Sequence, residues 1–291
     1  MSTLKSYPCL TGTEYARTHA SFRNITDTDT DNEKEASEQY PEYEDLICLV
    51  QDVITTFEGK PVDFLSIGVG TGVFETDLQT RCGLKIGHFM GIEPNPALFK
   101  GLEQIVASWN LESYTMSPKG FGGEKDEIDI TRKFDLILMS HVLYYMPCPE
   151  RAILKAFSYL KPGGKLVIFI HQRVFLYHLS MEYLKLAQLE GDKYRDYGDY
   201  TFADTDVYDI LDRNKIPYYK TVIPGITDLT AFLERENSDR VSFTIQTMYD
   251  NLPLDIQEKL YNFAKDRCTY TSDKQWISED HPNTMIVVYN N

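Results

Sequence analysis

The chain has 291 residues, of which 42% are apolar and 13% aromatic, and its formal net charge is −15. These values argue against disordered and fibrous classes, and no stretch is long and apolar enough to predict a transmembrane helix. With 29 basic against 44 acidic residues, the chain lacks the basic excess of nucleic-acid-binding proteins, whereas an acidic surface favours the approach of a cation. The alternative is that the charge only keeps the protein in solution.

The five cysteines are widely spaced, without a CxxC pair, and the N-terminal residues contain no apolar signal segment. This pattern predicts reduced thiols in a cytoplasmic protein, with neither a disulfide framework nor a metal site. We expect neither a membrane nor a nucleic acid as partner. A monomer is favoured, although the sequence leaves the oligomeric state open.

Strand and helix patterns alternate from residue 40 to residue 170, after a polar and acidic stretch over 26–37 (TDTDTDNEKEAS) that predicts a loop or a lid. Helices are expected where apolar residues recur at helical spacing, and strands where short apolar runs lie between turns. Repeated strand–helix units predict an α/β fold with a parallel sheet covered on both faces. In chain order the expected elements are a helix over 40–57, a strand over 62–67, a helix over 73–80, a strand over 85–93, a helix over 95–109, a strand over 134–139, a helix over 149–160 and a strand over 164–170. Later residues favour helical stretches rich in tyrosine, and then strands over 216–223 and 283–291.

Three glycines, Gly68, Gly70 and Gly72, follow the first predicted strand in FLSIGVGTGVFETDL (64–78). Glycine permits a tight turn and lets the backbone approach a ligand closely. The dinucleotide fingerprint G-x-G-x-x-G requires a glycine at position 73, where this chain has valine. The pattern G-x-G-x-G that remains is typical of S-adenosylmethionine-dependent methyltransferases, although a glycine-rich strand end on its own is often only a structural turn.

An acidic residue, Glu93, ends the second predicted strand, where a carboxylate can accept hydrogen bonds from both ribose hydroxyls of a nucleoside. A second glycine-rich turn in LKPGGKLVI (160–168) precedes a later strand. The glycine turn, the acidic strand end and this second turn occur in the order expected for an S-adenosyl-L-methionine site. Ser140, at the end of the strand over 134–139, is a further candidate for cofactor binding.

The sequence resembles the histamine N-methyltransferase family over residues 21–288. The similar motifs are SFR (21–23) followed by TDTD, LSIGVGTGVFETDL (65–78), IEP (92–94), LYYM (143–146) and NTMIVV (283–288). The resemblance is strong in the half that contains the glycines and thin between residues 174 and 278. It implies a Rossmann-like class I methyltransferase sheet, mainly parallel with an antiparallel last strand beside 216–223, and helical additions over the active site.

The resemblance also divides the chain. It implies a single methyltransferase domain over 1–291. Its expected parts are an N-terminal lid and helix (1–58), a cofactor-binding core (59–172), substrate-side additions with an intervening core strand (173–282) and the final strand (283–291).

The same resemblance implies residues around the methyl acceptor. Asp31 takes the place of the acidic residue that contacts the ammonium of the acceptor, and Asn283 that of an asparagine in the last strand. Tyr144 and Tyr145 match a pair of tyrosines. The family has a glutamate where this chain has the shorter Asp31, and a glutamine where it has His141, so the expected acceptor is a small amine or azole and not histamine in particular.

These residues support a simple chemistry. Asp31 would hold a cationic amine while a ring nitrogen attacks the methyl group, and His141 or Asn283 would fix the other ring nitrogen and select its tautomer. Aromatic residues could line the site and attract cations through their ring faces. The candidates for this lining are Phe22, Tyr144 and Tyr145.

Plainer interpretations stay open for each residue. Asp31 could cap a helix or lie in a solvated loop, His141 could be a core histidine, the tyrosines could only pack, and Asn283 could be a turn residue. The alternative functions are methyl transfer to another small molecule at oxygen or nitrogen, and a non-catalytic binding protein with the same fold. A macromolecular acceptor is the least favoured because the chain lacks a basic excess.

Overall fold

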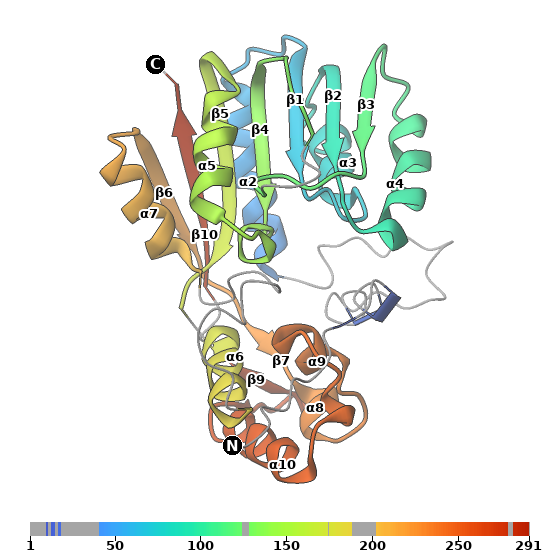
Figure 1. The fold of residues 1–291 in the computed structure, drawn as a ribbon, viewed down its shortest axis with the longest axis vertical. Helices are drawn as coiled ribbons and strands as arrows, with labels where there is room; N and C mark the ends of the chain where they lie inside the picture. The colour runs from blue at the N-terminus through green and yellow to red at the C-terminus, as the bar shows by residue number, and fades with distance from the viewer. Residues whose placement is uncertain are drawn as a thin grey trace.

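The structure, a computed structural model, describes residues 10, 13–14, 17–18, 41–123, 128–173, 175–187, 202–278 and 282–290. Its largest element is a seven-stranded sheet that brings the C-terminal strand beside strands from the middle of the chain (Figure 1). Across the sheet the strands are β3 (Tyr114–Ser117), β2 (Ile86–Ile92), β1 (Val62–Ile67), β4 (Phe134–Ser140), β5 (Leu160–His171), β10 (Asn283–Tyr289) and β6 (Tyr218–Ile223).

Strand directions follow the prediction. The strands β3, β2, β1, β4 and β5 pair in parallel, and β10 lies antiparallel between β5 and β6. The expected antiparallel last strand is thus confirmed. Because β10 runs in the opposite direction, its first residue, Asn283, lies at the edge where β5 ends and pairs with His171.

The predicted glycine-rich turn before β5 is instead a bulge within that strand. The residue of β5 that pairs with β4 changes abruptly from Leu160 to Lys165, so the four residues between them leave the ladder. Gly163 has a φ of 77°, a left-handed conformation that favours glycine. The bulge is held by the C-terminal end of the chain, since Gly163 N donates to Asn290 O at 2.6 Å.

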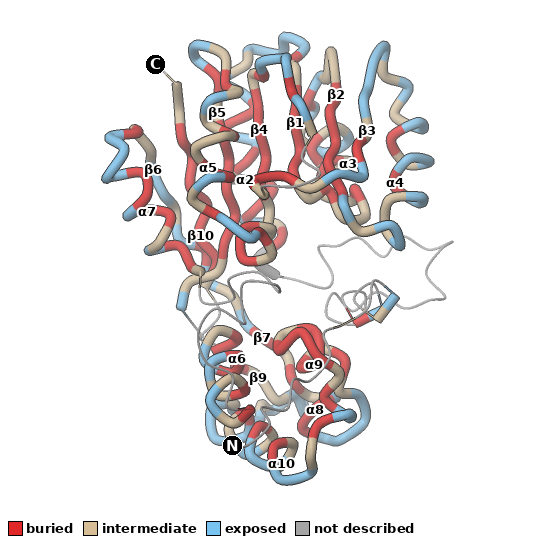
Figure 2. Tube along the Cα trace, in the orientation of Figure 1, coloured by how far each residue is buried: buried red, intermediate tan, exposed pale blue. Residues whose placement is uncertain are grey.

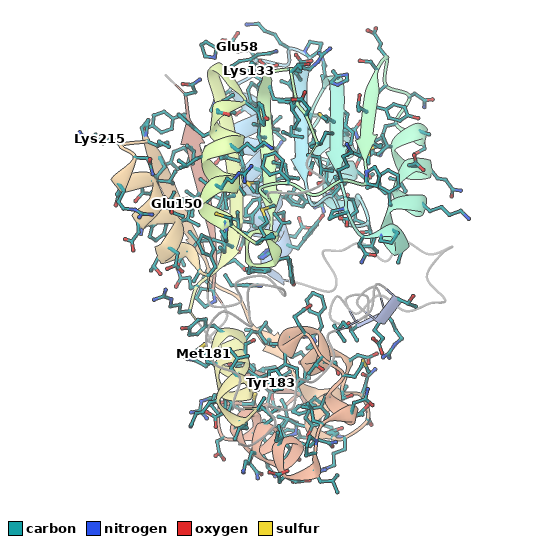
Figure 3. The ribbon with its side chains drawn as sticks, viewed as in Figure 1. Glu58, Lys133, Glu150, Met181, Tyr183 and Lys215 are labelled. Carbon is teal, nitrogen blue, oxygen red and sulfur yellow. The ribbon has the colours of Figure 1, made fainter. Side chains whose placement is uncertain are left out.

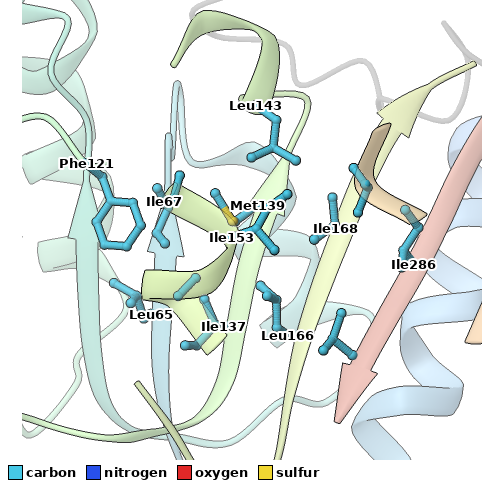
Figure 4. Close-up of a cluster of buried hydrophobic side chains, with 14 of the residues drawn as sticks. Leu65, Ile67, Phe121, Ile137, Met139, Leu143, Ile153, Leu166, Ile168 and Ile286 are labelled. Atoms are coloured by element: carbon cyan, nitrogen blue, oxygen red, sulfur yellow. The ribbon is translucent and has the colours of Figure 1, made fainter. Parts of the chain in front are cut away.

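Helices cover both faces of the sheet. Two buried clusters show how: Phe64 packs in a cluster with α2, α3 and α4 residues, while its neighbour Leu65 belongs to the cluster with α5 and α7. Adjacent residues of a strand point to opposite faces, so a strand covered on both sides is apolar throughout. Figure 4 shows Ile153 of α5 over Ile137, Met139 and Ile168 of the strands. The helices are α2 (Pro41–Thr55), α3 (Val73–Thr80), α4 (Pro96–Ser108), α5 (Pro149–Ser158) and α7 (Asp204–Arg213).

A second lobe lies beyond the carboxyl ends of the parallel strands (Figure 1). Its elements are α6 (Phe175–Leu186), β7 (Thr227–Asp228), α8 (Thr230–Leu233), α9 (Asp239–Ile245), η4 (Tyr249–Asn251), α10 (Leu254–Lys265), β8 (Thr269–Tyr270) and β9 (Trp276–Ser278). The expected helices are present, and a small three-stranded sheet, β7-β9-β8, was not expected. That these segments are additions to one domain stays a prediction.

The second lobe has a hydrophobic cluster of its own, and its interior is visible as buried segments in Figure 2. Its helix α6 is amphipathic: Tyr183 is buried, whereas Met181 is exposed, and Figure 3 shows the two on different sides of the helix. In an amphipathic helix the apolar face packs against the core, and here that face contains Tyr183. Among the described residues, no helix is long and apolar enough to span a bilayer.

The described N-terminal residues contact the second lobe. Arg17 Nη1 lies 2.6 Å from Asp239 Oδ2 at the start of α9, and Leu10 N donates to Gln246 O at 3.2 Å. Asp239 is buried, so its charge requires a partner. Leu10 and Arg17 are thereby attached to the lobe at the carboxyl edge of the sheet.

Candidate active site

The turn after β1 is held against the end of β2. Both Gly68 N and Val69 N donate to Ile92 O, at 2.7 and 3.1 Å. Gly68, Gly70 and Gly72 have φ values of 75, 62 and 76°. All three are therefore in the left-handed region, which explains why the sequence has glycine at every second position.

The three glycines differ in their surroundings. A Cβ added to Gly68 would lie 2.4 Å from Cγ2 of Val142, and one added to Gly72 would lie 2.8 Å from Cδ1 of Leu102. A Cβ added to Gly70 would meet nothing within 4 Å. The outer two glycines thus allow close packing of the chain, and the middle one presents backbone to open space.

Glu93 connects this turn to the start of α4. Its Oε2 accepts from Gly70 N and its Oε1 from Asn95 N, both at 2.8 Å. The residue is buried, at 6% exposure. Burial raises the pKa of the Glu93 carboxyl, although the two backbone hydrogen bonds act in the opposite direction. A carboxylate has about four acceptor positions, so both oxygens keep acceptor capacity beyond these two bonds.

The end of β4 lies directly beside the glycine turn. Ser140 is the last residue of β4 and half-buried, and His141 follows with a φ of 51°. His141 N donates to Phe169 O of β5 at 2.9 Å. The next residue is Val142, whose side chain fills the space over Gly68. The predicted cofactor and acceptor residues are therefore neighbours in space.

The two tyrosines lie in a 3-10 turn, η2 (Leu143–Tyr145). Tyr144 Oη is 3.0 Å from His141 Nδ1, and the rings of Tyr144 and Tyr145 meet edge to face with centroids 4.8 Å apart. Tyr145 also reaches the second lobe, with its ring 6.3 Å from that of Phe243 in α9. The predicted tyrosine pair thus joins the carboxyl edge of the sheet to the second lobe.

Asn283 is the first residue of β10, not a turn residue, and its exposure is 4%. It pairs with His171, the last residue of β5. The ring of His171 lies 4.5 Å from that of His141 and stacks on Tyr144 at 5.8 Å with an interplanar angle of 7°. Burial lowers the pKa of His171 to about 4, and the Asn283 side chain opposes this shift.

The structure therefore brings together His141, Tyr144 and Tyr145 at the carboxyl edge, after the strand β4 whose next residue, Val142, packs on Gly68. Asn283 lies at the same edge two strands away, opposite His171. Asp31 and Phe22, the two other predicted acceptor residues, lie outside the described residues. Sequence reasoning missed His171 and Phe243. A signal for His171 exists, because a histidine that ends an apolar strand run (LVIFIH) repeats the pattern that singled out His141 after LILMS.

Solved structures share this fold over most of the chain. The YcgJ protein from Bacillus subtilis has a TM-score of 0.58 and 12% identity, over 85% of this chain and 99% of that one. A putative methyltransferase from Bacillus halodurans has a TM-score of 0.54 and 10% identity, over 84% and 98%. The N-methyltransferase NodS from Bradyrhizobium japonicum, solved with S-adenosylhomocysteine, has a TM-score of 0.51 and 12% identity, over 95% and 98%. At these identities the likeness concerns the fold.

A sequence relative is an uncharacterized protein of Methanocaldococcus jannaschii, 26% identical over 134 residues. The match covers 43% of this chain and 32% of that protein, so the chain corresponds to about a third of the length of this relative. The family model described as a methyltransferase domain matches residues 40–197, more than half of the chain. The chain therefore belongs to the methyltransferase domain family, and its cofactor is S-adenosylmethionine.

Proposed function

We propose that this protein transfers a methyl group from S-adenosylmethionine to a nitrogen of a small amine or imidazole-type acceptor, similar to histamine. The observation that supports this best is the position of one side chain. Val142 lies over Gly68, between the turn expected to hold the cofactor and the polar aromatic residues expected to hold the acceptor. A methyl transferred in line needs its donor and acceptor side by side.

The residues around the glycine turn fit the cofactor. Gly70 has open space where its side chain would be, so a ligand can approach the backbone there. Glu93 would accept hydrogen bonds from the ribose hydroxyls with the acceptor capacity that its two backbone bonds leave. Ser140 would contribute from the end of β4. When bound, the cofactor supplies an activated methyl group on a sulfonium.

The residues beyond Val142 fit a flat or cationic acceptor. The rings of Tyr144 and Tyr145 meet edge to face, and aromatic ring faces attract ammonium and sulfonium groups. His141 and Asn283 would orient the ring nitrogen that does not react, and so select the tautomer whose other nitrogen has a free lone pair. Asp31 would pair with the ammonium and Phe22 would complete the aromatic lining, as the resemblance implies.

For this reaction the protein mainly has to align the methyl donor with the acceptor, and it does not need a strong general base. A neutral imidazole attacks with its own lone pair, since it titrates near 6.5, and it loses its proton after it has become cationic. Holding two reactants in line contributes about 7–11 kcal/mol to such reactions. The acidic balance of the chain, −15, also favours a cationic acceptor over a polyanionic one.

Mass spectrometry of purified protein with S-adenosylmethionine and a panel of biogenic amines, azoles, phenols and carboxylic acids tests the proposal. We expect methylated product only from amines or azoles, with transfer to nitrogen. Methylated product from a phenol or an acid would contradict the proposal and indicate an O-methyltransferase. Cofactor binding without any product across the panel would favour the non-catalytic alternative.

Asp31→Asn provides a further prediction. If Asp31 pairs with the acceptor ammonium, its loss removes binding in the ground state and in the transition state alike, so KM rises while kcat changes little. A charged hydrogen bond contributes about 1.5–3 kcal/mol, which corresponds to roughly 10- to 150-fold in KM for an amine-bearing acceptor. Steady-state kinetics measure both constants.

The chain offers a matched control in the same segment, TDTDTD (26–31). Asp29→Asn removes an equal charge two residues away and should leave KM unchanged. Equal effects of Asp29→Asn and Asp31→Asn would mean that Asp31 acts only through the overall negative charge of the segment and does not pair with the acceptor. A loss of turnover with unchanged KM would make it a base.

A further inference from the structure

One titratable residue at the carboxyl edge has no part in the function proposed above. His171 ends β5 and faces two residues of the expected acceptor site. Its ring centroid is 4.5 Å from that of His141, with a tilt of 39°, and 5.8 Å from that of Tyr144 in a stacked arrangement. Because Tyr144 Oη also contacts His141 Nδ1 at 3.0 Å, the three rings form one connected group.

The position of His171 opposite Asn283 is fixed by the backbone. The two residues pair in the antiparallel ladder of β5 and β10, and Asn283 pairs with Ile223 of β6 on its other side. Asn283 lies between two strands in the interior of the sheet, and only 4% of it is exposed. It has little freedom to move toward a ligand, whereas His171 interacts both with the Asn283 side chain and with the rings of His141 and Tyr144.

The polar atoms of this pair point to a specific arrangement. The Oδ1 atom of Asn283 is buried and forms no hydrogen bond of good geometry within the described part of the chain, although the amide lies close enough to His171 to oppose the lowering of its pKa. A buried carbonyl oxygen without a donor is costly. An imidazole N–H of His171 would satisfy it after a small rotation of either side chain. Burial keeps His171 neutral at physiological pH, because its pKa is lowered to about 4.

We propose that His171 is a positioning residue of the acceptor site: Asn283 fixes its tautomer, and its ring holds His141 and Tyr144 in the orientation in which they meet the acceptor. The inference rests on the proposed function, and it changes one assignment within it. Asn283 acts through His171 and does not contact the acceptor. A neutral imidazole with one nitrogen committed to Asn283 presents a defined face and a defined lone pair to its neighbours.

Kinetics with the best acceptor of the panel form the first test. His171→Phe retains a flat ring that can stack and removes both nitrogens, and Asn283→Ala removes the amide. Each should lower kcat roughly ten- to hundredfold through misplacement of the acceptor, with unchanged affinity for S-adenosylhomocysteine. If Asn283 acts through His171, the double variant should be no worse than the worse single variant. Additive losses would overturn the inference, because Asn283 would then act independently.

A matched control is available in β2. His88 is another half-buried strand histidine, and its Nδ1 lies 2.8 Å from Ser113 Oγ. It belongs to β2, whereas His141, Tyr144 and His171 follow or end β4 and β5. His88→Phe should leave kcat and KM unchanged. A loss of turnover in this variant equal to that of His171→Phe would mean that removing any strand histidine disturbs the sheet, and would overturn the positioning role.

A second readout does not depend on knowing the acceptor. Nitrogen NMR of the histidines in the protein saturated with S-adenosylhomocysteine reports their tautomers at neutral pH. We expect His171 to be neutral and in one tautomer, Asn283→Ala to mix its tautomers, and His171→Phe to shift the nitrogen signals of His141. Unchanged signals in Asn283→Ala would overturn the inference. If no acceptor is methylated, the proposed function fails while this measurement still decides on His171; if His171→Phe does not fold, Asn283→Ala decides alone.

Discussion

Glu93→Ala is expected to weaken the binding of S-adenosylmethionine by about 2–4 kcal/mol, or about 30- to 1,000-fold in Kd, since it removes charge-assisted hydrogen bonds to the ribose. The same carboxylate also accepts from Gly70 N and Asn95 N, so its loss leaves two backbone donors without their acceptor. Part of the effect therefore comes from a less ordered glycine turn. Isothermal calorimetry with S-adenosylmethionine and S-adenosylhomocysteine measures the change.

Two further variants serve as comparisons. Glu93→Gln keeps the size of the side chain, but its amide nitrogen would face one of the two backbone donors, so it too should bind weakly. Glu103→Ala, at an exposed position in α4, should leave Kd unchanged. Unaltered cofactor affinity in Glu93→Ala would contradict the assignment of Glu93 to the cofactor site.

The pH dependence of cofactor binding follows from the same carboxylate. Burial raises the pKa of Glu93 above its ordinary value of 4.5, and ribose hydroxyls donate best to the ionised form. Affinity should therefore be complete at neutral pH and fall as the pH drops through the raised pKa, earlier than for an exposed glutamate. In the Glu93→Ala variant this acidic fall should be absent. Calorimetry over a pH series, with thermal unfolding to confirm that the protein remains folded, tests the sign.

The elements with strong local patterns were predictable from the sequence. The bounds of β1 and α3 agree with the prediction because an apolar run that ends in glycine, followed by a helix, is a local signal. The edge strand β3 was not predicted, since it has four residues and Tyr114 is 44% exposed, so it lacks an apolar run. The strands of the small sheet in the second lobe have two or three residues, too few for any alternation to show.

The candidate site divides in the same way. Gly68, Gly70 and Glu93 could be proposed as cofactor residues because the motif occupies two short stretches of the sequence, and their role stays a prediction. His171 and Phe243 were missed because their relevance depends on tertiary contacts: His171 meets His141 only through the pairing of β4 with β5, and Phe243 meets Tyr145 only through the position of α9. No spacing within the sequence encodes those distances.

The glycine turn itself yields the other large effect, and a matched pair of variants isolates it. Gly68→Ala is expected to lower the free energy of unfolding by about 2–5 kcal/mol, from about 1–2 kcal/mol for a non-glycine residue in the left-handed region and about 1–3 kcal/mol for overpacking. The φ of Gly68 is 75°, and its new Cβ would lie 2.4 Å from Val142 Cγ2 and 3.0 Å from Val142 Cβ. Gly70→Ala, at a φ of 62° with nothing within 4 Å of its Cβ, should lose only about 1–2 kcal/mol.

For cofactor affinity we expect the opposite order, with the larger effect in Gly70→Ala. In Gly70→Ala the added methyl group enters the open space where the cofactor is expected, so Kd should rise more than the small loss of stability explains.

A double variant tests the contact between Gly68 and Val142. Adding Val142→Ala to Gly68→Ala removes the Cγ atoms that overlap and should restore part of the lost stability. Val142→Ala in the wild-type protein should not raise stability, because no overlap exists there to relieve. Urea unfolding monitored by circular dichroism, combined with calorimetry, measures both quantities. Equal losses of stability in Gly68→Ala and Gly70→Ala, without recovery in the double variant, would show that the packing of Val142 on the turn contributes nothing, and would remove the contact on which the adjacency of cofactor and acceptor rests.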